Sequence, residues 1–417
     1  MNEEQQGAFD IVTKQRSNIF LTGPAGTGKS FTIKEIVNWA KSSQKRLGVT
    51  SSTGTSAITI NGRTLHSFLG IGLAKKDAYQ LYMTSKRNSN LIEKLKLLDI
   101  LIIDEISMIS DKLFDKVSEY LSLIRKNKLP FGGIQLILCG DMCQLPPVDG
   151  EYCFKAKTWS SLNLNIIELK TLVRQDGDKE FQLILNEARF GTISNNHIER
   201  LKSLQNPNFG EVQPTVLYSK NINVDSVNNG EYTNLIKKGA LERVYYTQYS
   251  NNKHCQNWAE SLKLPSEVRL CIGSQVMLTV NLCVEEGLAN GSRGVVTEFT
   301  ENGPVVLFKT GDQVVIEPWI FVDDNEDIES SSDGEDEKIT VKCIPLRLAY
   351  ALTIHKSQSA TLDSAVVSLG ASIFEYGQAY TALSRVRDMK SIKVIDVLKS
   401  SFQTHPDVIE FYKQKNY

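Results

Sequence analysis

The sequence predicts an α/β protein with two parallel-sheet domains in tandem. A glycine-rich turn lies between an apparent strand and an apparent helix close to the start of the chain. Further short apolar runs alternate with helical stretches through both halves, as an α/β domain requires. The length of 417 residues is also more than one ordinary domain needs. We therefore place one domain at residues 1–168 and a second at residues 169–417.

The glycine-rich turn fills every required position of the pattern G-x-x-x-x-G-K-[ST] between the predicted strand 18–22 and a helix that begins at Lys29. Its backbone N–H groups can surround phosphate oxygens, and the helix amino terminus adds a positive dipole end. Lys29 would reach the outer phosphates, and the Ser30 hydroxyl can ligate Mg²⁺. ATP and Mg²⁺ are thus the predicted cofactors, held by Gly23, Pro24, Ala25, Gly26, Thr27, Gly28, Lys29 and Ser30.

Two further strands end in polar side chains that suit the same site. The apolar run 98–103 ends in Asp104 and Glu105. We expect Asp104 to hold Mg²⁺ together with Ser30, and Glu105 to orient and deprotonate the attacking water. The run 134–139 leads into a segment with two prolines, which fix its turn so that Gln144 is held toward a γ-phosphate.

Composition indicates a soluble intracellular protein. Hydrophobic residues make up 41% and charged residues 23% of the chain, and no apolar stretch is long enough to cross a membrane, so no membrane partner is expected. The amino terminus does not resemble a signal peptide, and seven scattered cysteines fit reduced thiols. Nine carboxylates crowd into residues 323–337, which leaves +8 on the rest of a chain whose net charge is −1. This acidic run is either a solvated loop or a DNA-mimicking inhibitory element.

These motifs, in this order, resemble those of the Pif-one DNA helicases, the RecD-related B branch of helicase superfamily one, over almost the whole chain. Residues 2–5 resemble the family's adenine-reading segment, with Gln5 in the key place. The resemblance implies two RecA-like domains that sandwich ATP, with a small wedge insertion at about 66–96 in the first. It also implies an SH3-like β-barrel insertion at about 271–343 in the second, with 323–337 as an acidic loop at its exit.

The resemblance also implies roles for residues outside the phosphate loop. Arg174 and Arg385 match the family's two arginines that reach the γ-phosphate across the cleft between the domains. The segments 48–57, 64–68 and 352–358 resemble its DNA-contacting motifs. The implied DNA-binding residues are Ser51, Thr53, His66, Ser67, Phe68, His355, Lys356 and Ser357. The chain departs from the family at Ser359–Ala360, where a glycine is usual.

The function that this resemblance implies is that of an ATP-dependent DNA helicase that moves 5′-to-3′ on one strand. The predicted catalytic residues are Lys29, Asp104, Glu105, Gln144, Arg174 and Arg385. The expected partners are single-stranded and partial-duplex DNA, bound by a monomer acting in DNA repair, recombination, replication or telomere maintenance. Two alternatives stay open: the motor subunit of a nuclease complex like RecD, and a non-enzymatic ATP-gated nucleic-acid clamp.

Overall fold

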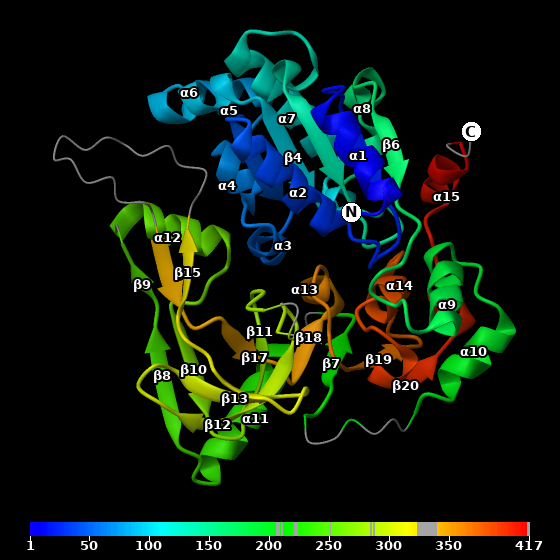
Figure 1. Cartoon of the computed structure of the whole chain (residues 1–417). Helices are drawn as coiled ribbons and strands as arrows, with labels where there is room; N and C mark the ends of the chain where they lie inside the picture. The colour runs from blue at the N-terminus through cyan, green and yellow to red at the C-terminus, as the bar shows by residue number, and fades with distance from the viewer. Residues whose placement is uncertain are drawn as a thin grey trace. The chain divides into compact units, whose positions relative to one another are not determined.

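The computed structural model forms two compact units, Met1–Arg174 and Gln175–Tyr417, each with its own parallel sheet (Figure 1). It describes residues 1–205, 209, 212–220, 224–250, 252–283, 286, 288–322 and 340–414. The acidic run 323–337 lies outside the described residues. The division falls after Arg174, whereas the sequence placed it after residue 168. In the described part of the chain, no helix is long and apolar enough to cross a membrane.

The first unit is built on a six-stranded parallel sheet in the order β3-β2-β4-β5-β1-β6. Its strands are β1 (Ile19–Thr22), β2 (Leu47–Ser51), β3 (Arg63–Thr64), β4 (Ile100–Asp104), β5 (Gln135–Cys139) and β6 (Asn165–Glu168). Its helices are α1 (Glu3–Thr13), α2 (Lys29–Ser42), α3 (Gly54–Thr59), α4 (Leu65–Leu69), α5 (Ala78–Ser85), α6 (Ser89–Leu97), α7 (Asp111–Arg125) and α8 (Lys157–Ser161). The predicted wedge insertion corresponds to the helices α4 to α6.

Both faces of this sheet are covered, which explains why its central strands β1, β4 and β5 are apolar at most positions. Successive side chains of a strand point to opposite faces. Ile19 and Leu21 of β1 therefore pack in one cluster with residues of α1 and α2. Phe20, between them, points to the other face, where its ring lies 5.5 Å from Trp159 of α8. Phe114 of α7 packs against the same tryptophan at 5.6 Å.

The second unit contains a four-stranded parallel sheet in the order β18-β7-β19-β20. Its strands are β7 (Thr215–Tyr218), β18 (Ala351–Thr353), β19 (Ala365–Leu369) and β20 (Ile392–Val397). The helices of this unit are α9 (Lys179–Arg189), α10 (Asn195–Lys202), α11 (Val224–Lys237), α12 (Asn252–Ser261), α13 (Ile354–Ser357), α14 (Gln378–Leu383) and α15 (Pro406–Lys413). With the parallel sheet of the first unit, this makes the predicted pair of RecA-like domains.

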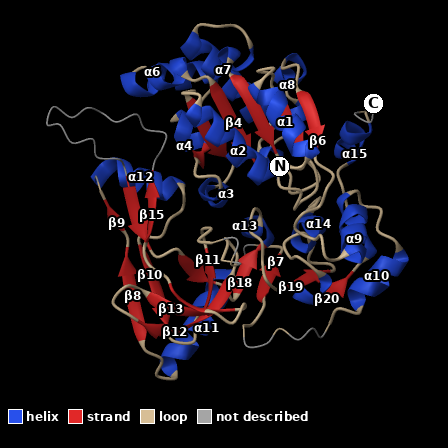
Figure 2. Cartoon of the chain, viewed as in Figure 1, coloured by secondary structure: helices blue, strands red, loops and turns tan. Residues whose placement is uncertain are grey.

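An antiparallel module is inserted in the second unit between β7 and β18 (Figure 2). Five strands pair in the order β14-β13-β12-β11-β17 around their own apolar cluster. The strands of the module are β8 (Glu242–Tyr246), β9 (Gln248–Tyr249), β10 (Glu267–Cys271), β11 (Gln275–Leu278), β12 (Arg293–Phe299), β13 (Pro304–Phe308), β14 (Gln313–Val315), β15 (Trp319–Val322), β16 (Thr340–Cys343) and β17 (Leu346–Leu348). β11 lies within the insertion predicted at about 271–343, and it pairs antiparallel with β12 and β17.

Candidate active site

The order of the strands brings three functional loops to one edge of the first sheet. β5 pairs with both β1 and β4, so the carboxyl ends of these three strands are neighbours. The glycine-rich loop follows β1, Glu105 follows Asp104 at the end of β4, and the segment with Gln144 follows β5. The Gly140 amide donates to the Leu21 carbonyl at 3.1 Å and ties two of these loops together. Ligands of open parallel sheets bind at this edge.

The glycine-rich loop has a backbone that ordinary residues would strain to adopt. Gly23, Gly26 and Gly28 have φ angles of +136°, +91° and +85°. A left-handed conformation is open to glycine but costs other residues about 1–2 kcal/mol. The Lys29 ammonium donates to the carbonyls of Gly23 and Pro24 at 2.7 and 2.9 Å. The loop is therefore curled around its own lysine at the start of α2.

Gln5 supports this loop from α1. It forms a reciprocal capping box with Asn2, in which the Gln5 Oε1 accepts from the Asn2 amide at 3.1 Å. The Gln5 Nε2 donates to the Thr27 carbonyl at 3.3 Å. A Cβ at Gly28 would lie 2.5 Å from the same nitrogen. Gln5 is therefore packed directly against the loop.

Asp104 is a buried carboxylate whose ionised form is disfavoured. Burial, and after it the charge of Glu105, raise the pKa of Asp104 to about 6, whereas a hydrogen bond from the Cys139 thiol and the Lys29 charge lower it. Ser56 of α3 donates to Asp104 Oδ2 at 3.4 Å. Glu105 has a left-handed backbone, with φ 51° and ψ 46°.

The donors near Asp104 fit a magnesium ion. Mg²⁺ prefers hard oxygen ligands, and Asp104 offers a carboxylate at the edge where Ser30 offers a hydroxyl from the first turn of α2. A divalent cation would also stabilise the ionised form that burial disfavours at Asp104.

Gln144 has one buried polar atom without a partner among the described residues. Its side chain is 4% exposed, and its Oε1 accepts no hydrogen bond there. The Gln144 backbone amide donates to the Asp141 carbonyl at 3.0 Å, which holds the turn. A buried amide in this state is poised to bond a further group.

Arg174 is attached to the glycine-rich loop through its backbone. The amides of Val173 and Arg174 both donate to the Gly26 carbonyl, at 2.9 and 3.1 Å. A Cβ at Gly23 would lie 2.2 Å from the Leu169 carbonyl oxygen, so residues 169–174 pack closely along the loop. This contact was not evident from the sequence, because nothing in the spacing of these residues signals it.

Arg385 lies in the second unit and is 2% exposed. Its Nε donates to the Thr381 carbonyl at 2.8 Å and its Nη2 to the Ser384 hydroxyl at 2.7 Å, both within or beside α14. Its Nη1 donates to the Ser357 carbonyl of α13 at 3.4 Å. The guanidinium thus links α14 to the segment that the sequence assigned to DNA.

Comparison with known proteins places this geometry in a family. The family model described as "PIF1-like helicase" matches residues 1–198, and that of "DNA helicase Pif1, 2B domain" matches residues 260–299. The "ATP-dependent DNA helicase PIF1" of Danio rerio is 35% identical over 99% of this chain. The chain belongs to the PIF1-like helicase family.

The chain spans different shares of the length of its relatives. It covers 64% of the Danio rerio protein, 92% of the 32% identical "ATP-dependent DNA helicase Pif1" of Bdellovibrio bacteriovorus, and 94% of the 34% identical "Uncharacterized protein 030L" of Invertebrate iridescent virus 6. The Pif1 helicase structure from Candida albicans matches with a TM-score of 0.78 and 32% identity over 99% of both chains.

Two solved structures of Bacteroides Pif1 contain bound molecules. The structure in complex with ADP-AlF4 matches with a TM-score of 0.81 and 26% identity, over 99% of this chain and 96% of that one. The structure bound to single-stranded DNA matches with a TM-score of 0.67 and 27% identity over the same shares.

The family's DNA motifs differ in accessibility here. Among the eight residues assigned to DNA, three are buried: Ser51, Phe68 and Ser357. The Ser357 hydroxyl donates to the Ile354 carbonyl at 2.8 Å. The other five are half-buried or exposed: Thr53, His66, Ser67, His355 and Lys356. Their DNA contacts stay predictions.

The two histidines of these motifs are neutral donors rather than cations near neutral pH. Burial lowers the pKa of His66. Burial also lowers the pKa of His355, although the charge of Glu375 acts in the opposite direction. Lys356, the cationic residue of its motif, is exposed.

The departure from the family at Ser359 has a visible consequence. Ser359 has a φ of +70°, a left-handed conformation that glycine adopts without strain. The neighbouring Ala360 amide donates to the Ser357 carbonyl at 3.1 Å, so the turn keeps its hydrogen bond. The chain therefore retains the turn that favours glycine, and the Ser359 backbone is strained in it.

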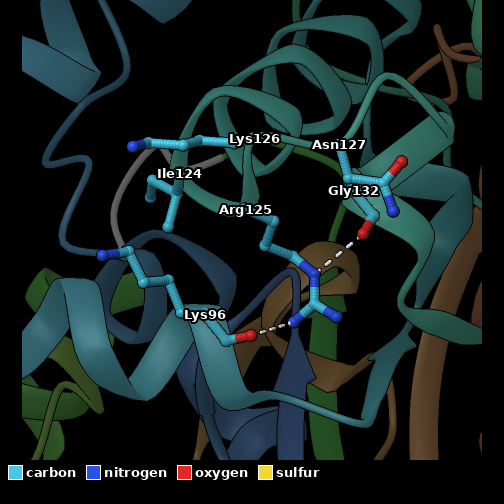
Figure 3. Close-up of a pocket in the computed structure, with 6 residues that line it drawn as sticks. All are labelled: Lys96, Ile124, Arg125, Lys126, Asn127 and Gly132. Carbon is cyan, nitrogen blue, oxygen red and sulfur yellow. Dashed lines mark hydrogen bonds between the residues drawn. The ribbon is translucent and has the colours of Figure 1, made fainter.

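A pocket of about 290 Å³ lies away from this site, where α6 and α7 end (Figure 3). Its Arg125 donates to the carbonyls of Gly132 and Leu98 at 2.8 and 2.9 Å, and also to those of Leu95 and Lys96. The arginine therefore satisfies carbonyls that the end of α6 leaves open. The carboxyl ends of α6 and α7, which carry the negative ends of the helix dipoles, both lie here. This explains the basic residues of the pocket, Lys96, Arg125 and Lys126, in structural terms.

Three residues near the acidic pair were missed from the sequence: Ser52, Ser56 and Cys139. Each is far from Asp104 along the chain, and the nearest signal was the run of small hydroxyl residues that follows β2. Because β2 pairs with β4 and Ser51 lies opposite Asp104, that run ends beside the acidic pair.

Proposed function

We propose that this chain is an ATP-dependent DNA helicase that moves 5′-to-3′ along one strand and separates duplex DNA. The observation that carries the proposal is the meeting of Lys29, the Asp104–Glu105 pair and Gln144 at one sheet edge in a member of the PIF1-like family. A protein that only clamps nucleic acid has no need of this hydrolytic set.

Each residue at the edge has a distinct task in ATP hydrolysis. Lys29 leaves the loop carbonyls and binds the β- and γ-phosphates. Glu105, at the end of β4, orients and deprotonates the attacking water. Gln144 offers its amide oxygen, which has no partner among the described residues, to the same water, or its amide nitrogen to a γ-phosphate oxygen.

Ser30 and Asp104 would hold Mg²⁺, which when bound neutralises charge on the phosphates. Gln5 would read the adenine from its position against the loop. This part of the proposal is supported by the donor chemistry of Asp104 and Ser30 and by the ADP-AlF4 complex of the Bacteroides relative.

Arg174 and Arg385 are proposed to act on the γ-phosphate. A guanidinium is always charged and grips phosphate oxygens with two parallel hydrogen bonds. Such arginines elsewhere speed phosphoryl transfer by about 10³- to 10⁵-fold. Arg385 must exchange at least one of its contacts to Thr381, Ser384 or Ser357 in order to do so.

Single-stranded DNA is the proposed track, bound by a monomer. The Bacteroides relative that was solved with single-stranded DNA supports this choice, as does the charge of +8 outside the acidic run. Contacts of Thr53, His66, Ser67, His355 and Lys356 to phosphates would position the strand without reading its sequence. Binding should therefore weaken steeply with salt and depend little on base composition. Roles in repair, recombination, replication or telomere maintenance stay predictions.

The test compares ATP hydrolysis in the presence of oligothymidylate for the wild type, Lys29→Ala and Glu105→Gln. Both variants should fold, because neither side chain is in the core, and both should lose at least about 100-fold of the DNA-stimulated rate. Lys34→Ala, in the same helix as Lys29, is the matched control and should hydrolyse at the wild-type rate. Wild-type turnover in either site variant would refute the assignment.

A further inference from the structure

Four hydrogen bonds join the last residue of β2 and the segment after it to the acidic pair. The Ser51 hydroxyl and the Ser52 amide donate to the Asp104 carbonyl at 3.3 and 3.2 Å. The Ser52 hydroxyl donates to the Glu105 carbonyl at 3.1 Å. The Ser56 hydroxyl donates to the Asp104 carboxylate at 3.4 Å. All four lie within the first unit, so they do not depend on how the two units are placed.

Thr53 begins a continuous route through these bonds. Its Oγ accepts from the Ser56 amide at 3.2 Å and caps α3, which leaves the Thr53 hydroxyl proton free to be donated to another acceptor. Ser56 in turn donates to Asp104. Two hydrogen bonds thus connect the half-exposed Thr53 to the buried carboxylate of the hydrolysis site.

The last bond in this route has room to tighten. The Ser56–Asp104 distance of 3.4 Å exceeds the ordinary O–H···O distance of about 2.7–2.8 Å. The two bonds use different groups of Ser56, its backbone amide and its hydroxyl, so they are coupled through the position of Ser56. A low-dielectric interior strengthens the bond to Asp104. Ser56 is fully buried, so a small shift of α3 is passed to Asp104 without competition from water.

Ser52 contacts Glu105, the second residue of the acidic pair. Glu105 keeps a left-handed backbone that a side chain other than glycine adopts at a cost. The Ser52 hydroxyl bonds to the carbonyl of this strained residue. A change in the turn at Ser52–Thr53 therefore acts on the Glu105 backbone through this bond.

We infer that Ser52 and Ser56 are positioning residues that transmit contact between a DNA strand and Thr53 to the Asp104–Glu105 pair. A strand phosphate that accepts from Thr53 fixes the turn and α3, which draws Ser56 onto the Asp104 carboxylate and sets Glu105 for proton abstraction. DNA stimulation of hydrolysis then passes through these two hydroxyls. This inference rests on the proposed helicase function.

The first experiment measures the ratio of hydrolysis rates with saturating oligothymidylate and without it. Ser56→Ala and Ser52→Ala should each lower this ratio by about 10-fold, because each removes a hydrogen bond to the acidic pair. Ser52→Thr keeps the hydroxyl and should restore the ratio. Ser118→Ala is the matched control, because the buried Ser118 hydroxyl accepts from the Phe131 amide, far from the pair. It should keep the wild-type ratio even if it melts earlier.

The second experiment measures binding alone. Coupling between two sites is reciprocal, so ADP with aluminium fluoride and Mg²⁺ should change the affinity of the wild type for a fluorescent oligothymidylate. In Ser56→Ala and Ser52→Ala, the ratio of the affinities measured with and without this analogue should fall toward one.

The outcomes separate this inference from the proposed function. A wild type that is stimulated by DNA, with equal stimulation in both alanine variants, overturns the inference and leaves the helicase proposal standing. A wild type that neither binds oligothymidylate nor responds to it overturns both. If Ser56→Ala does not fold, the pair Ser52→Ala and Ser52→Thr still decides, because Ser52 is only half-buried.

Discussion

Replacing Asp104 by Asn should stabilise the first unit while abolishing hydrolysis. The carboxylate is 5% exposed, and burial together with the Glu105 charge raise its pKa from 3.8 to about 6. A group whose folded pKa is raised holds its proton more tightly in the folded state. Its stabilising contribution is therefore complete below about pH 4 and is lost as the pH rises through about 6.

The size of the effect follows from the shift. A shift of about 2 units corresponds to about 3 kcal/mol between the two protonation states. Asn has nearly the same shape and its Oδ1 can still accept from Ser56. The variant should thus gain about 3 kcal/mol in the free energy of unfolding above about pH 7 and less than about 1 kcal/mol near pH 4. In a unit of residues 1–174, about 3 kcal/mol raises the Tm by about 6–12 °C.

The assay is calorimetry in EDTA at about pH 8 and about pH 4. The transition of the first unit is identified in a separate scan without EDTA, as the one that Mg-ATP shifts upward. Glu105→Gln is the matched comparison and should raise the Tm by less, because the Glu105 charge is the smaller of the two causes. A variant no more stable than the wild type at about pH 8 would refute the reasoning, as would an equal gain at both pH values.

Three further predictions test other parts of the structure. Gly28→Ala should bind a fluorescent ATP analogue at least about 10-fold more weakly, because the φ of Gly28 is +85° and the new Cβ would lie 2.5 Å from the Gln5 amide nitrogen. Gly7→Ala, which has open space around the new Cβ, is the control and should bind normally. Arg125→Ala should lower the free energy of unfolding in urea by about 1–3 kcal/mol, because several carbonyls lose their donor. Lys126→Ala should change it little, and equal losses in the two variants would contradict this role of Arg125. Cys283 is the one cysteine of seven that is not buried, so a thiol reagent should modify about one thiol in the folded protein, and rapid reaction of several would contradict the burial of the rest.

The placement of the three loops at one sheet edge could be predicted because its signals are local. The loop at residues 23–30 is contiguous, and helix α2 begins at Lys29 as its pattern indicates. Asp104 and Gln144 each follow an apolar run that could only be a buried strand. Parallel strands then place their carboxyl ends at one edge, whatever the connections between them.

Contacts between distant residues could not be predicted in the same way. Ser56 and Asp104 are 48 positions apart, and only the pairing of β2 with β4 brings them together. β18 has three residues, too few for a periodic signal, so its place in the second sheet was missed. An apolar run of four residues such as β11 does not by itself reveal whether its partners are parallel or antiparallel.

Only the departure from the family's sequence pattern pointed to the conformation of Ser359. The family's usual glycine suggested a special backbone there, and the φ of +70° accounts for it. The strain does not disturb the hydrogen bond across the turn. The sequence pattern revealed the position but not how a serine is accommodated.

The most direct measurement of the central claim is unwinding of two partial duplexes, one with a 5′ single-stranded tail and one with a 3′ tail, with phosphate release followed in the same samples. The account predicts ATP-dependent unwinding of the 5′-tailed duplex alone, accompanied by DNA-stimulated phosphate release that Glu105→Gln abolishes. Unwinding of only the 3′-tailed duplex, or the absence of any hydrolysis, would contradict it.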